Sequence, residues 1–259
     1  MSDPPLPLEG LHAVVTGAGR GIGAATARRL AEMGAAVTLV GRSVEPLREL
    51  AFELANDHGR LFHAAPADVT DTAQVESAFA EAREVMGPVA ILVNNAGAVE
   101  STPFLKLTEE RWRALVDVNL TSAFLCTQRA LPDMVEHGWG RVINVASVAG
   151  VTGIPYVSAY VAAKHGLVGL SRSLALEVAK KGVTVNAVCP GYVDTALVAG
   201  SVAALAEMTG RKGAELLDAM ISQNPSGRLL TPEEVASSIA WLCHPDQAMV
   251  TGQAIVIGG

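Results

Sequence analysis

Ser147, Tyr160 and Lys164 carry side chains that can move a proton together, and they occur in one short stretch. The apolar run at 141–146 predicts a buried strand that ends at Ser147. A helix is expected after Pro155, and the spacing of four puts Tyr160 and Lys164 on one face of it. An ammonium group lowers the pKa of a nearby phenol, so this phenol could exchange a proton with a carbonyl oxygen that Ser147 also contacts. The alternative is a core tyrosine and an unrelated surface lysine.

The composition is that of a folded α/β protein rather than a disordered or nucleic-acid-binding chain. The 259 residues are 50% hydrophobic and 17% charged, which is ample for a buried core. The net charge of -7, with no basic arm, argues against a nucleic-acid partner. The three cysteines and six histidines lack metal-ligand spacing, so we expect buried thiols, a reducing compartment and no metal.

Neither the start of the chain nor its apolar stretches predict membrane association. Residues 1–9 contain Asp3 and three prolines, which predicts a flexible tail rather than a signal peptide. The uncharged stretch at 142–163 is long enough to raise the question of a membrane span. Asn144 and Pro155 within it fit a buried strand, a loop and a helix start better. We therefore expect a soluble cytoplasmic protein without a membrane partner.

A glycine-rich turn, Gly17-Ala-Gly-Arg-Gly-Ile-Gly23, separates a strand predicted at 11–16 from a helix predicted at about 22–33. Glycines let the backbone approach a pyrophosphate closely, and a helix N-terminus attracts its charge. The spacing differs from the usual GxGxxG, and an ordinary tight turn is the alternative. The position between strand and helix favours a cofactor loop.

The end of the second predicted strand, at 36–40, indicates which dinucleotide is bound. An acidic residue there would hold the adenosine ribose of NAD(H) and repel a 2′-phosphate. This chain has Gly41 and then Arg42, with Arg20 in the glycine-rich turn. Two guanidinium groups can bind phosphate oxygens, so we predict NADP(H), with NAD(H) less favoured. The alternative for Arg42 is a solvated turn residue.

Polar residues also follow the strands predicted at 61–64 and 89–93. Asp68 could accept hydrogen bonds from the adenine amino group, or it could cap a helix that begins at Asp71. The small residues and amides at 94–97 would let the chain turn tightly beside a ligand.

Asn119 lies in a helical pattern that runs from Thr108 to about 131. A buried asparagine needs partners. Asn119 could stabilise the sheet, or it could hold a water that supplies protons to Lys164.

Strands and helices alternate along the whole chain, with further strands predicted at 183–188 and 254–257 and a last helix from Pro232 to about 242. This predicts a Rossmann-type doubly wound parallel sheet of about seven strands, in a single domain at 10–259. Residues 190–195 fall at the edge where such sheets bind ligands.

The segment at 196–224 is rich in alanine and glycine, and its helical pattern is broken at Gly200, Gly210 and Gly213. We interpret it as a mobile lid over the substrate. Arg211 and Lys212 within it fit solvated surface charge better than a site for an anionic substrate tail.

In combination and order, these motifs resemble the single-domain short-chain dehydrogenase/reductase family over nearly the whole chain, from about Leu8. The matching elements are Thr16 to Gly23, Asp68, Asn94 to Gly97, Asn119, Ser147, Tyr160-x-x-x-Lys164, and Pro190-Gly191 with Thr195. The resemblance implies a catalytic tetrad in which Tyr160 is the acid/base, Ser147 polarises the carbonyl, Lys164 binds the nicotinamide ribose and lowers the phenol pKa, and Asn119 supports a water relay.

The resemblance further implies a set of cofactor-binding residues, in which Val193 and Thr195 contact the nicotinamide carboxamide. The set is Gly17, Gly19, Arg20, Ile22, Arg42, Asp68, Val69, Asn95, Gly97, Tyr160, Lys164, Pro190, Gly191, Val193 and Thr195. Such enzymes are usually homotetramers acting on small carbonyl or alcohol substrates. The final Ile257-Gly258-Gly259 departs from the family, where many members carry an Asp before the paired glycines.

Three functions are compatible with these residues. The first is NADP(H)-dependent reduction of a ketone, with a 3-oxoacyl thioester or related oxo compound as substrate. The segments at 185–191 and 224–228 support it, since they are similar to those of 3-oxoacyl reductases, 3-hydroxybutyrate dehydrogenases and polyketide ketoreductases. The second is NAD-dependent oxidation of a secondary alcohol of the 3-hydroxy acid type. The third is nucleotide sensing without turnover, which the complete tetrad disfavours.

Overall fold

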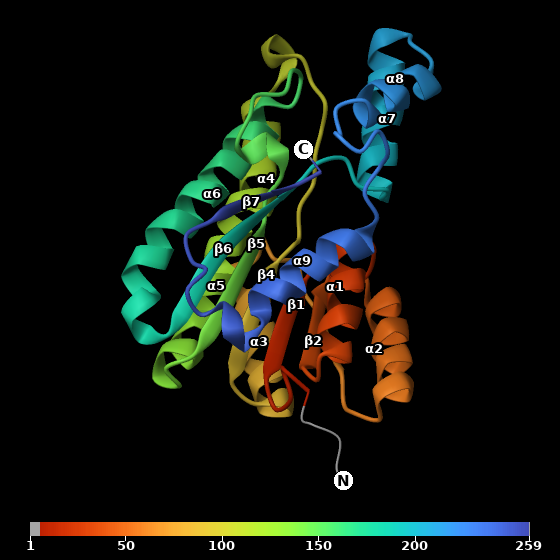
Figure 1. The fold of residues 1–259 in the computed structure, drawn as a ribbon. Helices are drawn as coiled ribbons and strands as arrows, with labels where there is room; N and C mark the ends of the chain where they lie inside the picture. Colours follow the sequence, from red (N-terminus) through yellow and green to blue (C-terminus); the bar gives the residue numbers. More distant parts are fainter. Residues whose placement is uncertain (1–5, 259) are drawn as a thin grey trace.

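A computed structural model describes residues 6–258, which form a parallel sheet of seven strands between two layers of helices (Figure 1). The strand order is β3-β2-β1-β4-β5-β6-β7, as predicted for a doubly wound sheet. The strands are β1 His12–Thr16, β2 Ala36–Gly41, β3 His63–Pro66, β4 Val89–Asn94, β5 Gly140–Val145, β6 Val183–Pro190 and β7 Ala254–Ile257. The strand order changes direction between β1 and β4, where such sheets open a crevice for a ligand.

The helices divide between the two faces of the sheet. They are α1 Gly21–Glu32, α2 Val44–His58, α3 Thr72–Met86, α4 Glu109–Val116, α5 Ser122–Glu136, α6 Ser158–Val178, α7 Ala196–Thr209, α8 Gly213–Ile221 and α9 Pro232–Cys243. Buried residues of α1, α2 and α9 share one core cluster, and those of α3, α5 and the end of α6 share another. Successive residues of a strand point to opposite faces, so Val14 packs in the second cluster and Val15 in the first.

The pair α7–α8 stands beyond the carboxyl ends of the strands, to one side of the sheet (Figure 1). Gly210 ends α7 in a left-handed conformation (φ 69°), as the sequence predicts for a break there. The predicted break at Gly200 is wrong, because Gly200 lies inside α7 among alanine and leucine residues with strong helix propensity.

Two further expectations need correction. The strand predicted at 61–64 begins at His63, because Thr38 to Gly41 of β2 pair with His63 to Pro66, and Leu61 is 61% exposed. Part of the predicted tail, residues 1–5, lies outside the described residues. Leu8, however, is fully buried and its backbone N–H donates to the Met33 carbonyl at 2.8 Å, so the packed chain includes residues before 10.

Cys126, Cys189 and Cys243 are buried free thiols, as predicted. Between residues 6 and 258, the helices are all too short or too polar to cross a membrane.

Candidate active site

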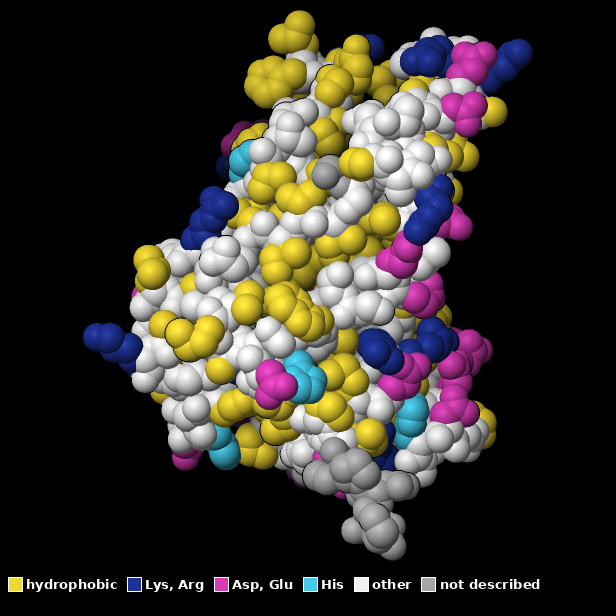
Figure 2. Space-filling view, viewed as in Figure 1, with side chains coloured by type: hydrophobic (Ala, Val, Ile, Leu, Met, Phe, Trp, Pro, Cys, Tyr) yellow, Lys and Arg dark blue, Asp and Glu magenta, His cyan; other side chains and the backbone are white. Residues whose placement is uncertain are grey.

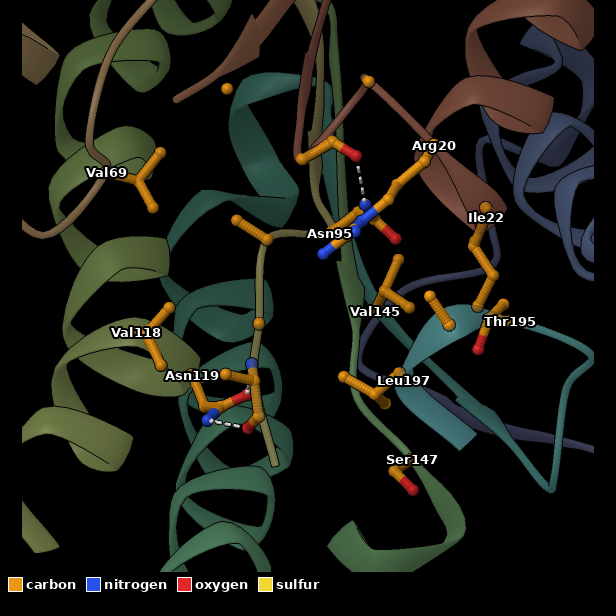
Figure 3. Close-up of a pocket in the computed structure, with 18 of the residues that line it drawn as sticks. Arg20, Ile22, Val69, Asn95, Val118, Asn119, Val145, Ser147, Thr195 and Leu197 are labelled. Carbon is orange, nitrogen blue, oxygen red and sulfur yellow. Dashed lines mark hydrogen bonds between the residues drawn. The ribbon is translucent and has the colours of Figure 1, made fainter. Parts of the chain in front are cut away.

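A cleft of about 1180 Å³ opens at the carboxyl ends of the strands. All of the residues predicted to bind cofactor or to act in catalysis line it, from Gly17 after β1 to Thr195 after β6. Figure 3 shows Arg20 and Ile22 on one side of the cleft, Val69 and Asn119 on the other, and Ser147 beyond Val145. The topology thus brings together side chains that are far apart in the sequence.

The Ser147 hydroxyl, the Tyr160 phenol and the Lys164 ammonium group belong to residues that line the wall of this cleft. Ser147 follows β5 and its Oγ accepts the Ala149 N–H at 3.1 Å. Lys164 is only 3% exposed, and its Nζ donates to the Val145 carbonyl at 2.8 Å. Nζ lies 5.6 Å from the centre of the Tyr160 ring. The two side chains therefore share one face of α6, as predicted, and the surface-lysine alternative is wrong.

The electrostatics of this group differ from the sequence-based expectation. Burial raises the pKa of Tyr160 to about 12, and hydrogen bonding by Ser147 offsets only part of that effect. Burial also lowers the pKa of Lys164 to about 8. The expected lowering of the phenol pKa is thus wrong in this structure, because the loss of solvent on burial is the largest effect on this group. At neutral pH the phenol is protonated, which is the form that can donate to a carbonyl oxygen.

Asn119 lies in a short π-helical segment, Asp117–Thr121, between α4 and α5. The sequence predicted one continuous helix here, and the π turn is a local departure of the kind found at functional sites. Asn119 Nδ2 donates to the carbonyls of Ala98 at 2.7 Å and Leu115 at 2.9 Å, and Oδ1 accepts the Ala98 N–H at 3.2 Å. The amide therefore holds the loop that follows β4 (Figure 3) rather than a strand.

Gly97 lies between Asn119 and Lys164. A Cβ atom added at Gly97 would stand 2.7 Å from Asn119 Oδ1 and 3.5 Å from Lys164 Nζ. Contacts below 3.0 Å force a neighbour to move. A Cβ at position 97 would therefore displace Asn119, while its distance to Lys164 Nζ is an ordinary van der Waals contact.

The glycine-rich turn is tied to the end of β4 by Thr16 and Asn95. Thr16 Oγ1 accepts the N–H of Asn95 at 3.0 Å, and Asn95 Nδ2 donates to the Thr16 carbonyl at 2.9 Å. Asn95 Nδ2 also donates to the Gly17 carbonyl at 3.2 Å (Figure 3). A Cβ at Gly23 would lie 2.2 Å from the Gly17 carbonyl oxygen, so α1 packs directly on the turn. The set of predicted site residues omitted Thr16, although its position at the end of β1 could have indicated this role.

The first turn of α1 fits an anionic ligand. Its N-cap, Arg20, contributes no side-chain hydrogen bond to it within the described chain, and its first turn has no acidic residue. Helix α3 differs, because Asp71 accepts the N–H groups of Ala73 and Gln74. N-terminal N–H groups without a protein cap beside a glycine turn can bind a pyrophosphate.

Arg20, in the turn after β1, and Arg42, directly after β2, are both exposed and line the cleft. Asp68 accepts the backbone and side-chain donors of Thr70 at 2.9 and 2.7 Å. These bonds, and then the charge of Arg42, lower the pKa of Asp68. The capping alternative for Asp68 is wrong, because Asp71 caps the helix.

The loop after β6 is held by a residue that the sequence analysis did not select. Asn224 is 2% exposed; its Oδ1 accepts the Tyr192 N–H at 3.0 Å, and its Nδ2 donates to the Tyr192 carbonyl at 2.9 Å. A Cβ at Gly191 would lie 2.3 Å from the Gly258 carbonyl oxygen. The loop that carries Val193 and Thr195 is therefore fixed by distant parts of the chain.

Comparisons with known proteins agree with this geometry. A family model described as short chain dehydrogenase matches residues 11–206. The chain is 39% identical to a D-beta-hydroxybutyrate dehydrogenase of Rhizobium meliloti, over 95% of this chain and 96% of the relative. It is 36% identical to the 3-oxoacyl-[acyl-carrier-protein] reductase FabG of Aquifex aeolicus, over 97% of each. A crystal structure of an actinorhodin polyketide ketoreductase variant with NADPH superposes with a TM-score of 0.91, at 38% identity over 96% of each chain.

These matches agree with the family implied by the motifs. The family works with nicotinamide dinucleotides on small carbonyl and alcohol compounds. The chain therefore belongs to the short-chain dehydrogenase family and is an oxidoreductase of ketone and secondary alcohol groups.

Proposed function

We propose that this protein is an NADP(H)-dependent reductase of a 3-oxoacyl thioester or a related oxo compound. The observation that carries the proposal is the grouping of Ser147, Tyr160 and Lys164 at the wall of the cleft that begins at the uncapped N-terminus of α1. Proton donation and dinucleotide binding would then occur side by side.

In this proposal the glycine-rich turn and the first turn of α1 hold the pyrophosphate of the cofactor. Arg20 and Arg42 bind the 2′-phosphate, and the absence of an acidic residue at 41–43 removes the group that would repel it. Asp68 and Val69 would hold the adenine, and Asn95 and Gly97 would contact the middle of the cofactor. Pro190, Gly191, Val193 and Thr195 line the nicotinamide end.

When bound, the reduced nicotinamide supplies the hydride that adds to the carbonyl carbon. Tyr160 gives its proton to the carbonyl oxygen, and the Ser147 hydroxyl donates a hydrogen bond to the same oxygen as charge develops on it. Lys164 has three N–H donors, of which Val145 accepts one, and the other two would hold the ribose of the bound cofactor. Asn119 holds the Gly97–Ala98 loop against this group and supports the water that returns protons to it.

A second candidate is NAD-dependent oxidation of a secondary alcohol of the 3-hydroxy acid type. The 39% identity to a D-beta-hydroxybutyrate dehydrogenase favours it. The two candidates differ in the cofactor, so the dissociation constants of NADPH and NADH separate them. Tighter binding of NADH would favour the second candidate.

We also propose that α7 and α8 close over the substrate as a lid and that the chain assembles as a homotetramer. Large apolar side chains remain exposed along the chain, among them those of Phe104, Leu105, Phe124, Trp241, Met249 and Val256. Figure 2 shows hydrophobic side chains gathered on the face that carries α9 and β7. Exposed apolar surface on this face suits contact with a second copy of the chain, and light scattering of the purified protein would measure the mass of the assembly.

Turnover tests the main proposal. The protein is mixed with NADPH and a panel of 3-oxoacyl thioesters and simpler ketones, and loss of NADPH absorbance is followed. Tyr160→Phe should lower kcat at least about 100-fold, because it removes the proton donor, while the dissociation constant of NADPH stays unchanged. The matched control is Tyr156→Phe, since the Tyr156 side chain is 51% exposed. Turnover retained by Tyr160→Phe would remove Tyr160 from its proposed role.

A further inference from the structure

The loop between β6 and α7 is held from two sides by segments that lie late in the chain. On one side, the Gly191 N–H donates to the Ile257 carbonyl of β7 at 2.9 Å. On the other side, the Leu230 N–H donates to the Tyr192 carbonyl at 2.9 Å, and the Asp194 N–H donates to the Leu230 carbonyl at 2.8 Å. These bonds fix the backbone of the loop relative to the sheet.

The side chain of Asn224 completes the second side. Its Oδ1 atom accepts the Tyr192 N–H at 3.0 Å, and its Nδ2 atom donates to the carbonyls of Tyr192 at 2.9 Å and Arg228 at 2.8 Å. The amide thus bonds to both backbone groups of Tyr192, as the facing residue of a paired strand does. Because both N–H groups of the amide are used and only 2% of Asn224 is exposed, the orientation of this amide is fixed.

Gly191 allows the amide to lie directly on the backbone of the loop. A Cβ atom at Gly191 would stand 2.5 Å from Asn224 Oδ1 and 2.3 Å from the Gly258 carbonyl oxygen. Both distances are too short for a side chain to fit without displacing its neighbours. A shift of the Asn224 amide would therefore act on the loop without a side chain between them.

The same loop forms part of the wall of the cleft. Gly191, Val193 and Thr195 line the cleft, whereas Asn224 is not among its lining residues. Figure 3 shows Thr195 and Ile22 at the same wall, and a Cβ at Gly21 would lie 3.3 Å from Thr195 Cγ2. The loop thus extends from the sheet to the N-terminus of α1, and a change in its position would alter this part of the cleft.

We propose that Asn224 is a positioning residue, which sets where the nicotinamide of the bound cofactor lies relative to Ser147 and Tyr160. It acts through the backbone of Tyr192 on Val193 and Thr195 rather than by contact with the cofactor. The proposal rests on the proposed function, in which this loop holds the nicotinamide end. Without the amide, the Tyr192 N–H and the Arg228 carbonyl lose these partners, and the loop can take other positions.

Two ligands distinguish the position of this loop from the stability of the fold. NADPH carries the nicotinamide ring and 2′-phospho-ADP-ribose lacks it, while both carry the pyrophosphate and the 2′-phosphate. Asn224→Leu removes the hydrogen bonds but keeps the number and branching of the side-chain heavy atoms. In titration calorimetry we expect the dissociation constant of NADPH to rise about tenfold and that of 2′-phospho-ADP-ribose to stay within about twofold. Equal changes for the two ligands would overturn the proposal.

Asn186 provides the matched control, because it is also a buried asparagine whose amide bonds to distant backbone groups. Its Nδ2 atom donates to the Val250 carbonyl at 2.7 Å, and its Oδ1 atom accepts the Gln253 N–H at 3.1 Å. Asn186 lies within β6 and is not a lining residue of the cleft. Asn186→Leu should lower the urea midpoint of unfolding but leave the ratio of the two dissociation constants as in the wild type. The same change of ratio in both leucine variants would contradict a specific role of Asn224.

A second variant, Asn224→Asp, alters a single heavy atom and keeps the test available if the leucine variant does not fold. Its carboxyl oxygen replaces Nδ2, opposite the carbonyls of Tyr192 and Arg228. An ionised carboxylate cannot donate to these carbonyls, whereas the neutral acid, which burial favours, can donate to one of them. Binding of NADPH relative to 2′-phospho-ADP-ribose should therefore recover at least about threefold from pH 8 to pH 5.5. A ratio that stays constant over this range would contradict control of the loop by these bonds.

Turnover separates this proposal from the one on which it rests. If the wild type reduces ketones with NADPH, Asn224→Leu should lower kcat at least about tenfold, because hydride transfer depends steeply on the placement of the ring. If Asn224→Leu keeps the kcat and the NADPH affinity of the wild type, ketone reduction stands and the role of Asn224 is wrong. If the wild type neither binds NADPH nor reduces a ketone with it, the proposed function fails and the assignment of Asn224 fails with it.

Discussion

Helices α1 and α7 follow β1 and β6 and begin at the same edge of the sheet, yet α1 is largely buried and α7 is not. Seven residues of α1 are buried, and the helix packs against α9 and the glycine-rich turn. All fourteen residues of α7 lie within the described chain, and none of them is buried. The two helices nevertheless approach each other, because a Cβ at Gly21 would lie 3.3 Å from Thr195 Cγ2.

Under the proposed function, this difference separates a fixed side that binds the cofactor from an adaptable side that binds the substrate. The same dinucleotide binds in every reaction cycle. Close backbone packing around it therefore does not reduce the number of different substrates that the protein can accept. Substrates must enter and leave, and elements with few buried apolar contacts are the ones that open at low free energy. The same substitution, glycine to alanine, should therefore have opposite consequences on the two sides.

The largest effect is expected at Gly23. A Cβ at this position would lie 2.2 Å from the Gly17 carbonyl oxygen and 2.6 Å from Asn95 Nδ2. Because the first of these neighbours is backbone, Gly23→Ala must push α1 away from the turn. We expect the dissociation constant of NADPH to rise at least about 100-fold, a loss of about 2.7 kcal/mol, as measured by titration calorimetry. Unchanged affinity would show that the packing of α1 on the turn does not shape the site.

A smaller loss is expected at Arg42, which tests the charge of the cofactor side rather than its packing. Arg42→Ala removes a charged partner of the 2′-phosphate, and such bonds contribute about 1.5–3 kcal/mol. The dissociation constant of NADPH should therefore rise about 10- to 100-fold, while that of NADH stays within about twofold. Arg48→Ala is the matched control, since Arg48 is also an exposed arginine and lies in α2, the helix that follows Arg42. Equal losses for both cofactors would contradict 2′-phosphate recognition.

The sequence predicted the strand, glycine-rich turn and helix at the start of the chain, and the shared helix face of Tyr160 and Lys164, because these features are local patterns. The order Thr16 to Gly23 and the spacing of Tyr160 and Lys164 are each contained in a few residues, and one turn of helix fixes what they place together. The Asn224–Tyr192 hydrogen bonds join residues 32 positions apart, so a local sequence pattern could not predict them. The direction of the Tyr160 pKa shift was missed for a related reason, since it depends on burial, which arises only when the whole fold is assembled.

The proposed catalytic group of Ser147, Tyr160 and Lys164 lines the same cleft, and the pH dependence of turnover should reflect its burial. The pKa of Lys164 is lowered from 10.5 to about 8, and that of Tyr160 is raised to about 12, so Lys164 loses its proton first as pH rises. We expect kcat/KM for NADPH, which reports on the free enzyme, to be constant below about pH 8 and to fall about tenfold per unit above it. The neutral amine no longer stabilises the charge that develops on the phenol.

The control for this profile is the affinity for NADPH, measured at the same pH values. A fall in affinity equal to the fall in kcat/KM would assign the effect to binding rather than to proton transfer. A profile that stays flat to about pH 10 would mean that the ammonium form of Lys164 is not required.

The smallest effect, and one of opposite sign, is expected at Gly200 in α7. An added Cβ there meets nothing within 4 Å among the described atoms, and the residue lies inside a helix. Alanine restricts the unfolded chain more than glycine does, so Gly200→Ala should raise the free energy of unfolding by about 0.5–1 kcal/mol in urea titrations. NADPH affinity should not change. If α7 acts as a lid that must bend at Gly200, the same variant should lower kcat while it stabilises the fold, because the glycine would then serve motion rather than structure.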